Sequence, residues 1–464
     1  MKIKAVLLAL MLLIVNCAAL ARDARLQGAK PQVIAFVGVN VVPMDRERVI
    51  ENQTVIVRGD RIAEIGPAAK IKVPADALRV EARGKYLMPG LAEMHGHLPH
   101  PNQGEALSNS FLLLFVANGV TTVRGMFGFP NHPALRDRIN RGEVFGPKLY
   151  VAGPAMTGQS VHSPEEGAQK VREYKQAGFD LLKIHEGLSL ATYDAIVKTA
   201  KEVGLPFGGH IPDAVGLPHA LKAGQSTVEH LDGYVEELEA DDSPVRNADP
   251  MTHAQKFVDY LDERKIPRLV EATREAGAWV VPTMALWQAF MGTESVESLK
   301  QRPELKYVPQ AMVNQWAQQR AGQLMQNPDP KPGQRVLDLR NKILKALQEG
   351  TGRVMLGSDA PQLFSVPGFS LHREMQAMAR AGLTPYQILT AGTRNPAVYL
   401  KAEGEFGTVE VGKRADLILV DDNPLKDVAN VARRSGVVLR GQWLSEDSLR
   451  KMLDDLAATY VSNK

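Results

Sequence analysis

Short apolar runs alternate with amphipathic helical stretches through the middle of the chain. This alternation is typical of a parallel β-sheet whose strands are joined by helical crossovers. Eight runs of strand length can be counted, and eight is the number of strands that closes a (β/α)8 barrel. The runs are the one that leads into His95, followed by 120–124, 149–152, 181–185, 206–210, 226–230, 279–283 and 354–359.

Both ends of the chain have a different pattern. Residues 33–87 and 407–441 contain short alternating apolar runs separated by turns, which predict β-strands. The simplest arrangement is that the two ends pair into one small β-domain. Leu449, Met452, Leu453 and Leu456 have helical spacing and predict a closing helix. Residues 241–340 form the longest irregular region, so we expect an inserted helical lid or extended helices there.

The first residues predict a secretory signal peptide. Two lysines are followed by an apolar run at 5–15 and by the A-x-A site Ala19-Leu20-Ala21. We therefore expect an exported protein, periplasmic or secreted, with no membrane span after cleavage. The alternative is lipid attachment at Cys17, the only cysteine. Cleavage after Ala21 would leave no cysteine, which excludes disulfides and thiolate metal ligands.

Composition adds little beyond this. A chain of 464 residues with 44% hydrophobic and 23% charged residues is globular and can bury a large core. The formal charge of +3 is too small to indicate a polyanion partner. We expect no binding to nucleic acid.

Candidate metal ligands stand at the ends of the predicted strands. His95 and His97 are two residues apart on a strand, so both imidazoles project from one face. In a barrel, the carboxyl ends of all strands meet at one rim. Imidazole and carboxylate donors suit a borderline divalent metal such as zinc. The further candidates at such positions are Lys183, His185, His210, His230 and Asp359.

The chain resembles the amidohydrolase superfamily, and within it the imidazolonepropionase-like and Xaa-Pro dipeptidase-like hydrolases. The resemblance spans nearly the whole mature chain. It departs from the family's pattern at Val123-Arg124-Gly125, where these members usually have an acidic residue after the arginine. The matching stretches are 88–91 with His95-Gly96-His97, 119–124, 182–184, 209–210, 228–230, 356–359, 393–397, 412–417 and 422–425.

The resemblance implies an α/β fold in which a (β/α)8 barrel is flanked by a small β-sandwich built from both ends of the chain. The expected division is a signal peptide at 1–21, sandwich at 22–88 and 403–445, the hydrolase barrel at 89–402, and a C-terminal helix at 446–464. It also implies that His95, His97 and Asp359 bind one metal, that His210 and His230 bind a second, and that a carboxylated Lys183 bridges the two.

Two metals that share a water can acidify it to hydroxide and stabilise the oxyanion that forms on a carbonyl. Asp359 would pass the proton to the leaving nitrogen. Hydrolysis of a C–N bond is the natural chemistry of such a site. His185 shares the strand face of Lys183, and Tyr234 follows His230, so both are candidate substrate contacts.

The expected substrate is a small amide, with dipeptides ending in proline or similar N-acyl compounds as leading candidates. Rival hypotheses are hydrolysis of a lactone or another ester, and a non-catalytic protein that binds metal or solute. The same ligands accept zinc, manganese, iron or cobalt. The sequence is compatible with a homo-oligomer and does not define the oligomeric state.

Overall fold

A computed structural model describes residues 32–246, 248, 253, 256–326 and 329–461. The predicted signal peptide, with Cys17, lies outside the described residues. Within the part of the chain that is described, none of the helices combines the length and the apolar character needed to cross a bilayer.

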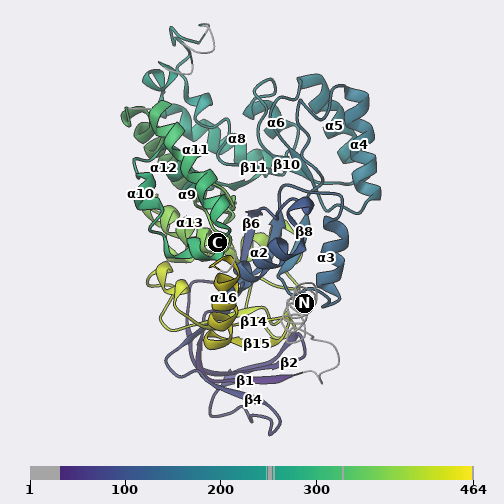
Figure 1. The fold of residues 1–464 in the computed structure, drawn as a ribbon, viewed down its shortest axis with the longest axis vertical. Helices are drawn as coiled ribbons and strands as arrows, with labels where there is room; N and C mark the ends of the chain where they lie inside the picture. Colours follow the sequence, from purple (N-terminus) through teal and green to yellow (C-terminus); the bar gives the residue numbers. More distant parts are fainter. Residues whose placement is uncertain (1–31, 247, 249–252, 254–255, 327–328, 462–464) are drawn as a thin grey trace, which may run out of the picture.

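The two ends of the chain share one eight-stranded sheet, drawn at the bottom of Figure 1. Strand β5 pairs antiparallel with β13, which places Leu87 opposite Leu419. The predicted pairing of both ends is thus confirmed, whereas a sandwich of two layers stays a prediction. The order is β15-β14-β13-β5-β1-β2-β3, with β4 beside β1. The bounds are β1 (Val33–Val41), β2 (Ile50–Arg58), β3 (Arg61–Pro67), β4 (Leu78–Glu81), β5 (Tyr86–Pro89), β13 (Leu417–Val420), β14 (Arg434–Leu439) and β15 (Gln442–Ser445).

Seven of the eight predicted central strands form as two parallel sheets. One has the order β6-β7-β8 and the other β12-β11-β10-β9. Single parallel bridges link Ala152 to Leu181 and Val280 to Val354. The bounds are β6 (Leu91–Gly96), β7 (Val120–Gly125), β8 (Lys148–Val151), β9 (Leu182–Ile184), β10 (Phe207–Gly209), β11 (Thr227–Glu229) and β12 (Trp279–Val281).

The eighth predicted strand is not a regular strand. Residues 354–359 make isolated contacts instead, in which Met94 N donates to Leu356 O and Asp359 N donates to His95 O. A further single bridge joins Ala360 to Gly96. The segment therefore lies beside β6, and a closed barrel stays a prediction.

Local sequence determines where the helices between the central strands begin and end and which face is buried. In α5 (Leu190–Val203), Ser189 accepts a hydrogen bond from Thr192 N at the start, and Gly204 adopts the left-handed conformation at the end. Tyr193, Ile196 and Ala200 recur at helical spacing and are buried. The other helices of this half are α2 (Glu105–Ala117), α3 (His132–Asn140), α4 (Pro164–Gln176) and α6 (Leu217–Lys222), with the 3-10 turns η1 (Pro101–Gln103) and η2 (Glu236–Leu238).

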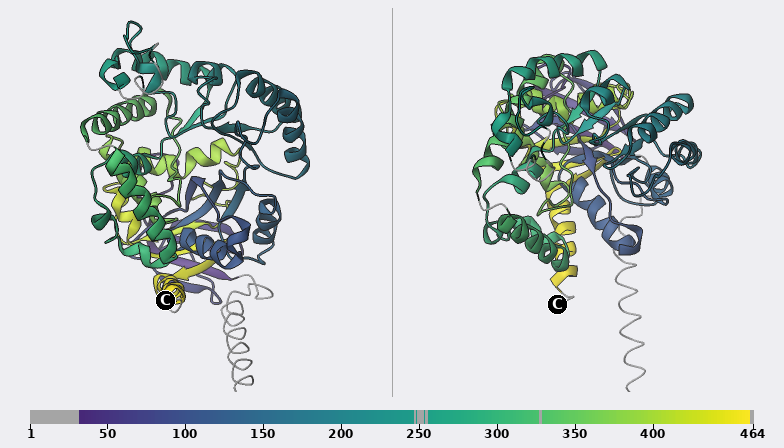
Figure 2. Two further views of the ribbon diagram at one scale, coloured as in Figure 1. Left: turned by 45° about the horizontal axis from the view of Figure 1, so that its top comes forward. Right: turned by 90° about the horizontal axis from the view of Figure 1, so that it is seen from above.

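The second half is mostly helical, as predicted for residues 241–340. In the left view of Figure 2, its green helices near residues 310–350 lie on the side of the molecule opposite α4 and α5. The helices of this half are α8 (Ile266–Ala276), α9 (Met284–Met291), α10 (Val296–Leu299), α11 (Gln310–Gln326), α12 (Lys331–Thr351), α13 (Phe369–Arg380), α14 (Pro385–Gly392) and α15 (Arg394–Tyr399), with η3 (Phe257–Tyr260), η4 (Glu263–Lys265), η5 (Pro303–Tyr307) and η6 (Val428–Ala432). Helix α16 (Glu446–Val461) matches the predicted closing helix.

Candidate metal centre

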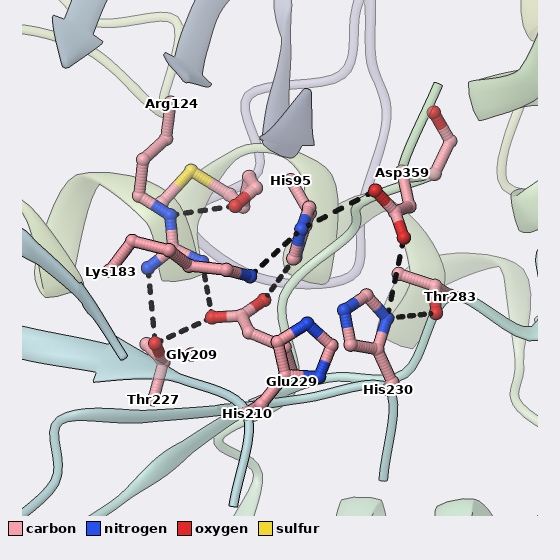
Figure 3. Close-up of polar contacts among 12 residues, drawn as sticks. His95, Arg124, Lys183, Gly209, His210, Thr227, Glu229, His230, Thr283 and Asp359 are labelled. Atoms are coloured by element: carbon pink, nitrogen blue, oxygen red, sulfur yellow. Dashed lines mark hydrogen bonds and ion pairs between the residues drawn. The ribbon is translucent and has the colours of Figure 1, made fainter. Parts of the chain in front are cut away.

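The carboxyl ends of the central strands bring predicted ligands together, and Figure 3 shows His95, Lys183, His210, His230 and Asp359 among them. His95 lies in β6 and Lys183 in β9, while His210 and His230 directly follow β10 and β11. Asp359 belongs to the bridging segment beside β6. Residues that are far apart in sequence meet here because parallel strands all end at the same rim.

Asp359 lies among three imidazoles. Its Oδ1 atom is 2.5 Å from His97 Nε2 and 3.5 Å from His95 Nε2, and its Oδ2 atom is 3.7 Å from His230 Nδ1. One ligand atom each from His95, His230 and Asp359 falls within 4.8 Å of the others. Nitrogen and carboxylate donors at this spacing fit a divalent cation.

A second group of imidazoles adjoins the first. The ring of His210 is 4.7 Å from that of His230 and 4.3 Å from that of His185. Asp232 Oδ2 lies 2.7 Å from His210 Nδ1 and orients that ring. Lys183 Nζ lies 3.4 Å from His95 Nε2. The structure thus brings His185 and Lys183 to the same cluster as the four predicted histidine ligands.

Burial keeps these groups in the form that binds metal. It lowers the pKa values of His95 and His230 well below their usual range, and that of His210 to about 3. Neutral imidazoles offer a lone pair to a cation. Burial also lowers the pKa of the Lys183 ammonium. Within the described residues, Lys183 forms no salt bridge, and the charges of Glu229 and Asp359 only partly oppose the effect of burial on its pKa.

The family model for the amidohydrolase family matches residues 86–444, which cover the ligand set and part of the terminal sheet. The chain belongs to the amidohydrolase family. Amidohydrolases depend on metal and hydrolyse C–N bonds, and the His95, His230 and Asp359 cluster of this amidohydrolase is suited to bind metal.

Relatives and solved structures agree with this assignment. Ochratoxinase from Aspergillus niger is 22% identical over 85% of this chain and 82% of its own length. The structure of bottromycin amidohydrolase has a TM-score of 0.71 at 23% identity and covers 96% of this chain and 93% of its own. A putative prolidase from Bifidobacterium longum has a TM-score of 0.66 at 21% identity, with 92% and 100% covered. These similarities show the fold that the amidohydrolase shares with them.

Glu229 is a supporting residue that the sequence analysis missed. Its carboxylate lies between Arg124 Nη2 and His95 Nδ1, at 2.7 Å from each, and all three side chains are fully buried. The carboxylate therefore orients the His95 ring and neutralises Arg124. Gly125 follows Arg124 in this chain, and the carboxylate that pairs with Arg124 comes from Glu229 in β11. The sequence signal that could have identified Glu229 is its position directly before the candidate ligand His230.

Replacing Glu229 by glutamine is expected to lower the free energy of unfolding by about 3 kcal/mol, because Arg124 would remain buried without a counter-charge. Denaturant unfolding of the metal-free protein measures the change. The double variant Glu229→Gln/Arg124→Met removes both charges and should recover part of the loss. Equal stability of Glu229→Gln and the unaltered protein would contradict the role assigned to this ion pair.

Glu93 joins the two segments that carry His95 and Asp359. Its Oε1 atom accepts hydrogen bonds from His95 N at 3.0 Å and Ser358 N at 2.9 Å, and its Oε2 atom accepts one from Ser358 Oγ at 2.6 Å. Burial raises the pKa of Glu93 to about 8. The residue holds β6 against the bridging segment from inside the protein.

Tyr234 does not join the cluster. Its side chain is fully buried, and its hydroxyl lies 2.7 Å from Thr273 Oγ1 in α8. A substrate contact by Tyr234, which the sequence suggested, is therefore corrected: the loop after β11 turns this ring into the core. His185 lies beside His210 and is partly exposed, so a substrate contact by His185 stays a prediction.

Proposed function

We propose that the chain is an exported hydrolase that cleaves an amide or peptide-like C–N bond in a small substrate. Dipeptides that end in proline and N-acyl amino acids are the leading candidates. The observation that carries the proposal is the position of Asp359, whose carboxylate contacts His97 and lies within 4 Å of two further imidazoles. A carboxylate there can ligate a cation with one oxygen and accept a proton with the other.

In this proposal, His95, His97 and Asp359 would hold one divalent ion, expected to be zinc, and His210 and His230 would hold a second. Such ions would acidify a water and polarise the scissile carbonyl. Lys183, as an anionic carbamate, would supply a further negatively charged ligand to the ions. Its burial supports this, because a lowered amine pKa favours the neutral form that reacts with carbon dioxide. Asp359 accepts the proton of the attacking water and delivers it to the leaving nitrogen.

A substrate screen with metal analysis tests the proposal. Purified protein is loaded with Zn²⁺ or Mn²⁺, and its metal content is measured on the sample used for assays. We expect about two ions per chain and turnover of dipeptides or N-acyl amino acids. Lactones and other esters form the second arm, and turnover confined to them would change the assigned bond. Metal binding with no turnover in either arm would favour a binding protein.

Phe127 is expected to contribute to the choice of substrate. It follows β7 at the rim, its ring centroid is 6.1 Å from that of His97, and it is 39% exposed. Phe129 supports it at a ring distance of 5.6 Å. An exposed aromatic ring beside a candidate ligand can pack against an apolar group of a bound substrate.

Replacing Phe127 by alanine is expected to lower kcat/KM about tenfold for substrates with an aromatic or branched side chain, as loss of one ring contact is worth roughly 1.4 kcal/mol. Glycine-containing analogues should change less than twofold. Steady-state kinetics on matched pairs gives the comparison, and Phe145→Ala is the control, because that ring packs in a separate apolar cluster with Leu439 and Leu449. The same loss for both kinds of substrate would contradict a role in specificity.

Export is proposed from residues 1–21 alone. Fractionation of cells that express the full chain, with mass analysis of the mature N-terminus, tests it. A terminus at Arg22 supports secretion after cleavage, a lipidated Cys17 supports membrane anchoring, and an intact Met1 in the cytoplasm would contradict export.

A further inference from the structure

Several residues at the rim have a left-handed backbone although they are not glycine, and three of them belong to the site or contact it. The three are His230 with φ 61°, Thr283 with φ 47° and Asp359 with φ 57°. This conformation is least favourable for a β-branched residue such as threonine. Thr283 is nevertheless fully buried, and its Oγ1 atom lies 2.9 Å from His230 Nδ1 (Figure 3). The surroundings must therefore hold Thr283 in place.

Thr283 occupies the N-cap position of α9, yet its hydroxyl does not cap the helix. A threonine in this position usually accepts a hydrogen bond from one of the first helical amides. Here the amides of Met284 and Ala285 donate instead to the two carboxylate oxygens of Glu374, at 2.8 and 2.6 Å. Because Glu374 supplies the cap from α13, the Thr283 hydroxyl is available to the His230 imidazole.

Among the described residues, the hydrogen bonds of the Glu374 side chain are those to the first amides of α9. Its side chain is fully buried, and no salt bridge to it is formed among the described residues. A buried carboxylate is costly unless its charge is satisfied, and the amide end of a helix satisfies it in part. The buried carboxylate lies at the first turn of α9, next to Thr283, which contacts the candidate ligand His230.

Helix α9 contacts His230 at a second point. Trp287, one turn into the helix, donates from Nε1 to His230 O at 2.9 Å. The first turn of α9 thus holds both the imidazole and the backbone of His230. Arg340 of α12 and Val281 O also hold the His230 backbone, so a displacement of that turn would chiefly change the orientation of the ring.

We propose that Glu374 is a positioning residue for the metal site, acting through Thr283 on His230. A hydrogen bond to one ring nitrogen fixes the tautomer and leaves the other nitrogen as the electron-pair donor. The inference rests on the proposed function, since it takes His230 as a ligand. Glu374 contacts neither substrate nor ion, and its effect is on the affinity and geometry of the site.

Zn²⁺ affinity of the full chain, measured by competition with a chromophoric chelator, tests this. Thr283→Val keeps the shape and removes the hydroxyl, and Glu374→Gln removes one of the two acceptors. Each is expected to weaken Zn²⁺ binding at the more affected site about 10- to 100-fold. Thr283→Ser retains the hydroxyl and should stay within about threefold of the unaltered protein.

Asp416→Asn is the matched control, because Asp416 is also a buried carboxylate that accepts a backbone amide, from Arg440 N, but it pairs with Arg414 at the terminal sheet. It should lower the thermal stability without changing Zn²⁺ affinity. Circular dichroism shows that each variant is folded before titration. Unchanged Zn²⁺ affinity in a folded Glu374→Gln variant would overturn the proposal.

The double variant Glu374→Gln/Thr283→Val decides whether Glu374 acts through Thr283. If it does, the double variant loses no more affinity than Thr283→Val alone, because contacting residues on one path are not additive. If the fold losses in Zn²⁺ affinity of the two single variants multiply in the double variant, Glu374 does not act through Thr283. If the unaltered protein binds no Zn²⁺, the proposed function is wrong. If the unaltered protein binds Zn²⁺ and turns over substrate but the variants have the same Zn²⁺ affinity, only the role of Glu374 is rejected.

Discussion

Asp359→Asn is expected to lower kcat by about a thousandfold or more while much of the metal stays bound. Asparagine keeps the size and one oxygen acceptor of the side chain, but it cannot accept the proton that the attacking water must lose. General acid–base groups contribute about 10²- to 10⁴-fold, and Asp359 also contributes charge to the site. Steady-state kinetics and metal analysis on the same preparation measure the two effects separately.

Asp421→Asn, in the terminal sheet, is the control for this change, since Asp421 contacts Lys85 and Ser435 rather than the site. Its kcat should stay within about twofold of the unaltered value. Loss of metal and activity in parallel in Asp359→Asn would leave Asp359 as a ligand only. Full activity in the variant would contradict the proposed mechanism.

Lys183→Ala is expected to lower kcat/KM on the order of a thousandfold, because it removes the group that would carry the negative charge of the carbamate. The unaltered lysine should in turn need carbon dioxide. The amine adds to carbon dioxide and releases one proton, which gives the carbamate. Protein stripped with a chelator and reloaded with Zn²⁺ in carbon-dioxide-free buffer should regain little activity until bicarbonate is added.

Lys342→Ala is the matched control, because that lysine pairs with Glu263 on the surface. It should respond to chelation and bicarbonate as the unaltered protein does. Mass analysis of the native protein should show one carboxylation of 44 Da, a value fixed by the mass of carbon dioxide, that is absent from Lys183→Ala. Reactivation independent of bicarbonate would contradict the carbamate.

The strand positions of the candidate ligands followed from local patterns. His95 and His97 share a face because strands have a period of two, and the rim gathers strand ends wherever they occur in sequence. The eighth strand failed as a prediction because an apolar run such as 354–356 predicts burial without fixing its hydrogen-bond partners. Val354 and Leu356 are fully buried, yet their backbone makes only isolated contacts.

The supporting residues could not be predicted in the same way. Glu374 caps a helix that begins 90 residues earlier, and Glu229 orients a ring 134 residues away. Tertiary packing determines which residues make such contacts, and it produces no periodic pattern of hydrophobic and polar positions in the sequence. Tyr234 illustrates the converse, since a position near a ligand predicts proximity along the chain but not the direction of the side chain.

The pairing of β5 with β13 also bears on how the chain is synthesised. Until residues 417–420 have been made, one edge of β5 has no partner from the C-terminal half, and an exposed strand edge is a template for aggregation. The terminal sheet has a high contact order, so it completes late. A chain truncated before β13 is therefore expected to collect in the insoluble fraction even though every candidate ligand is present.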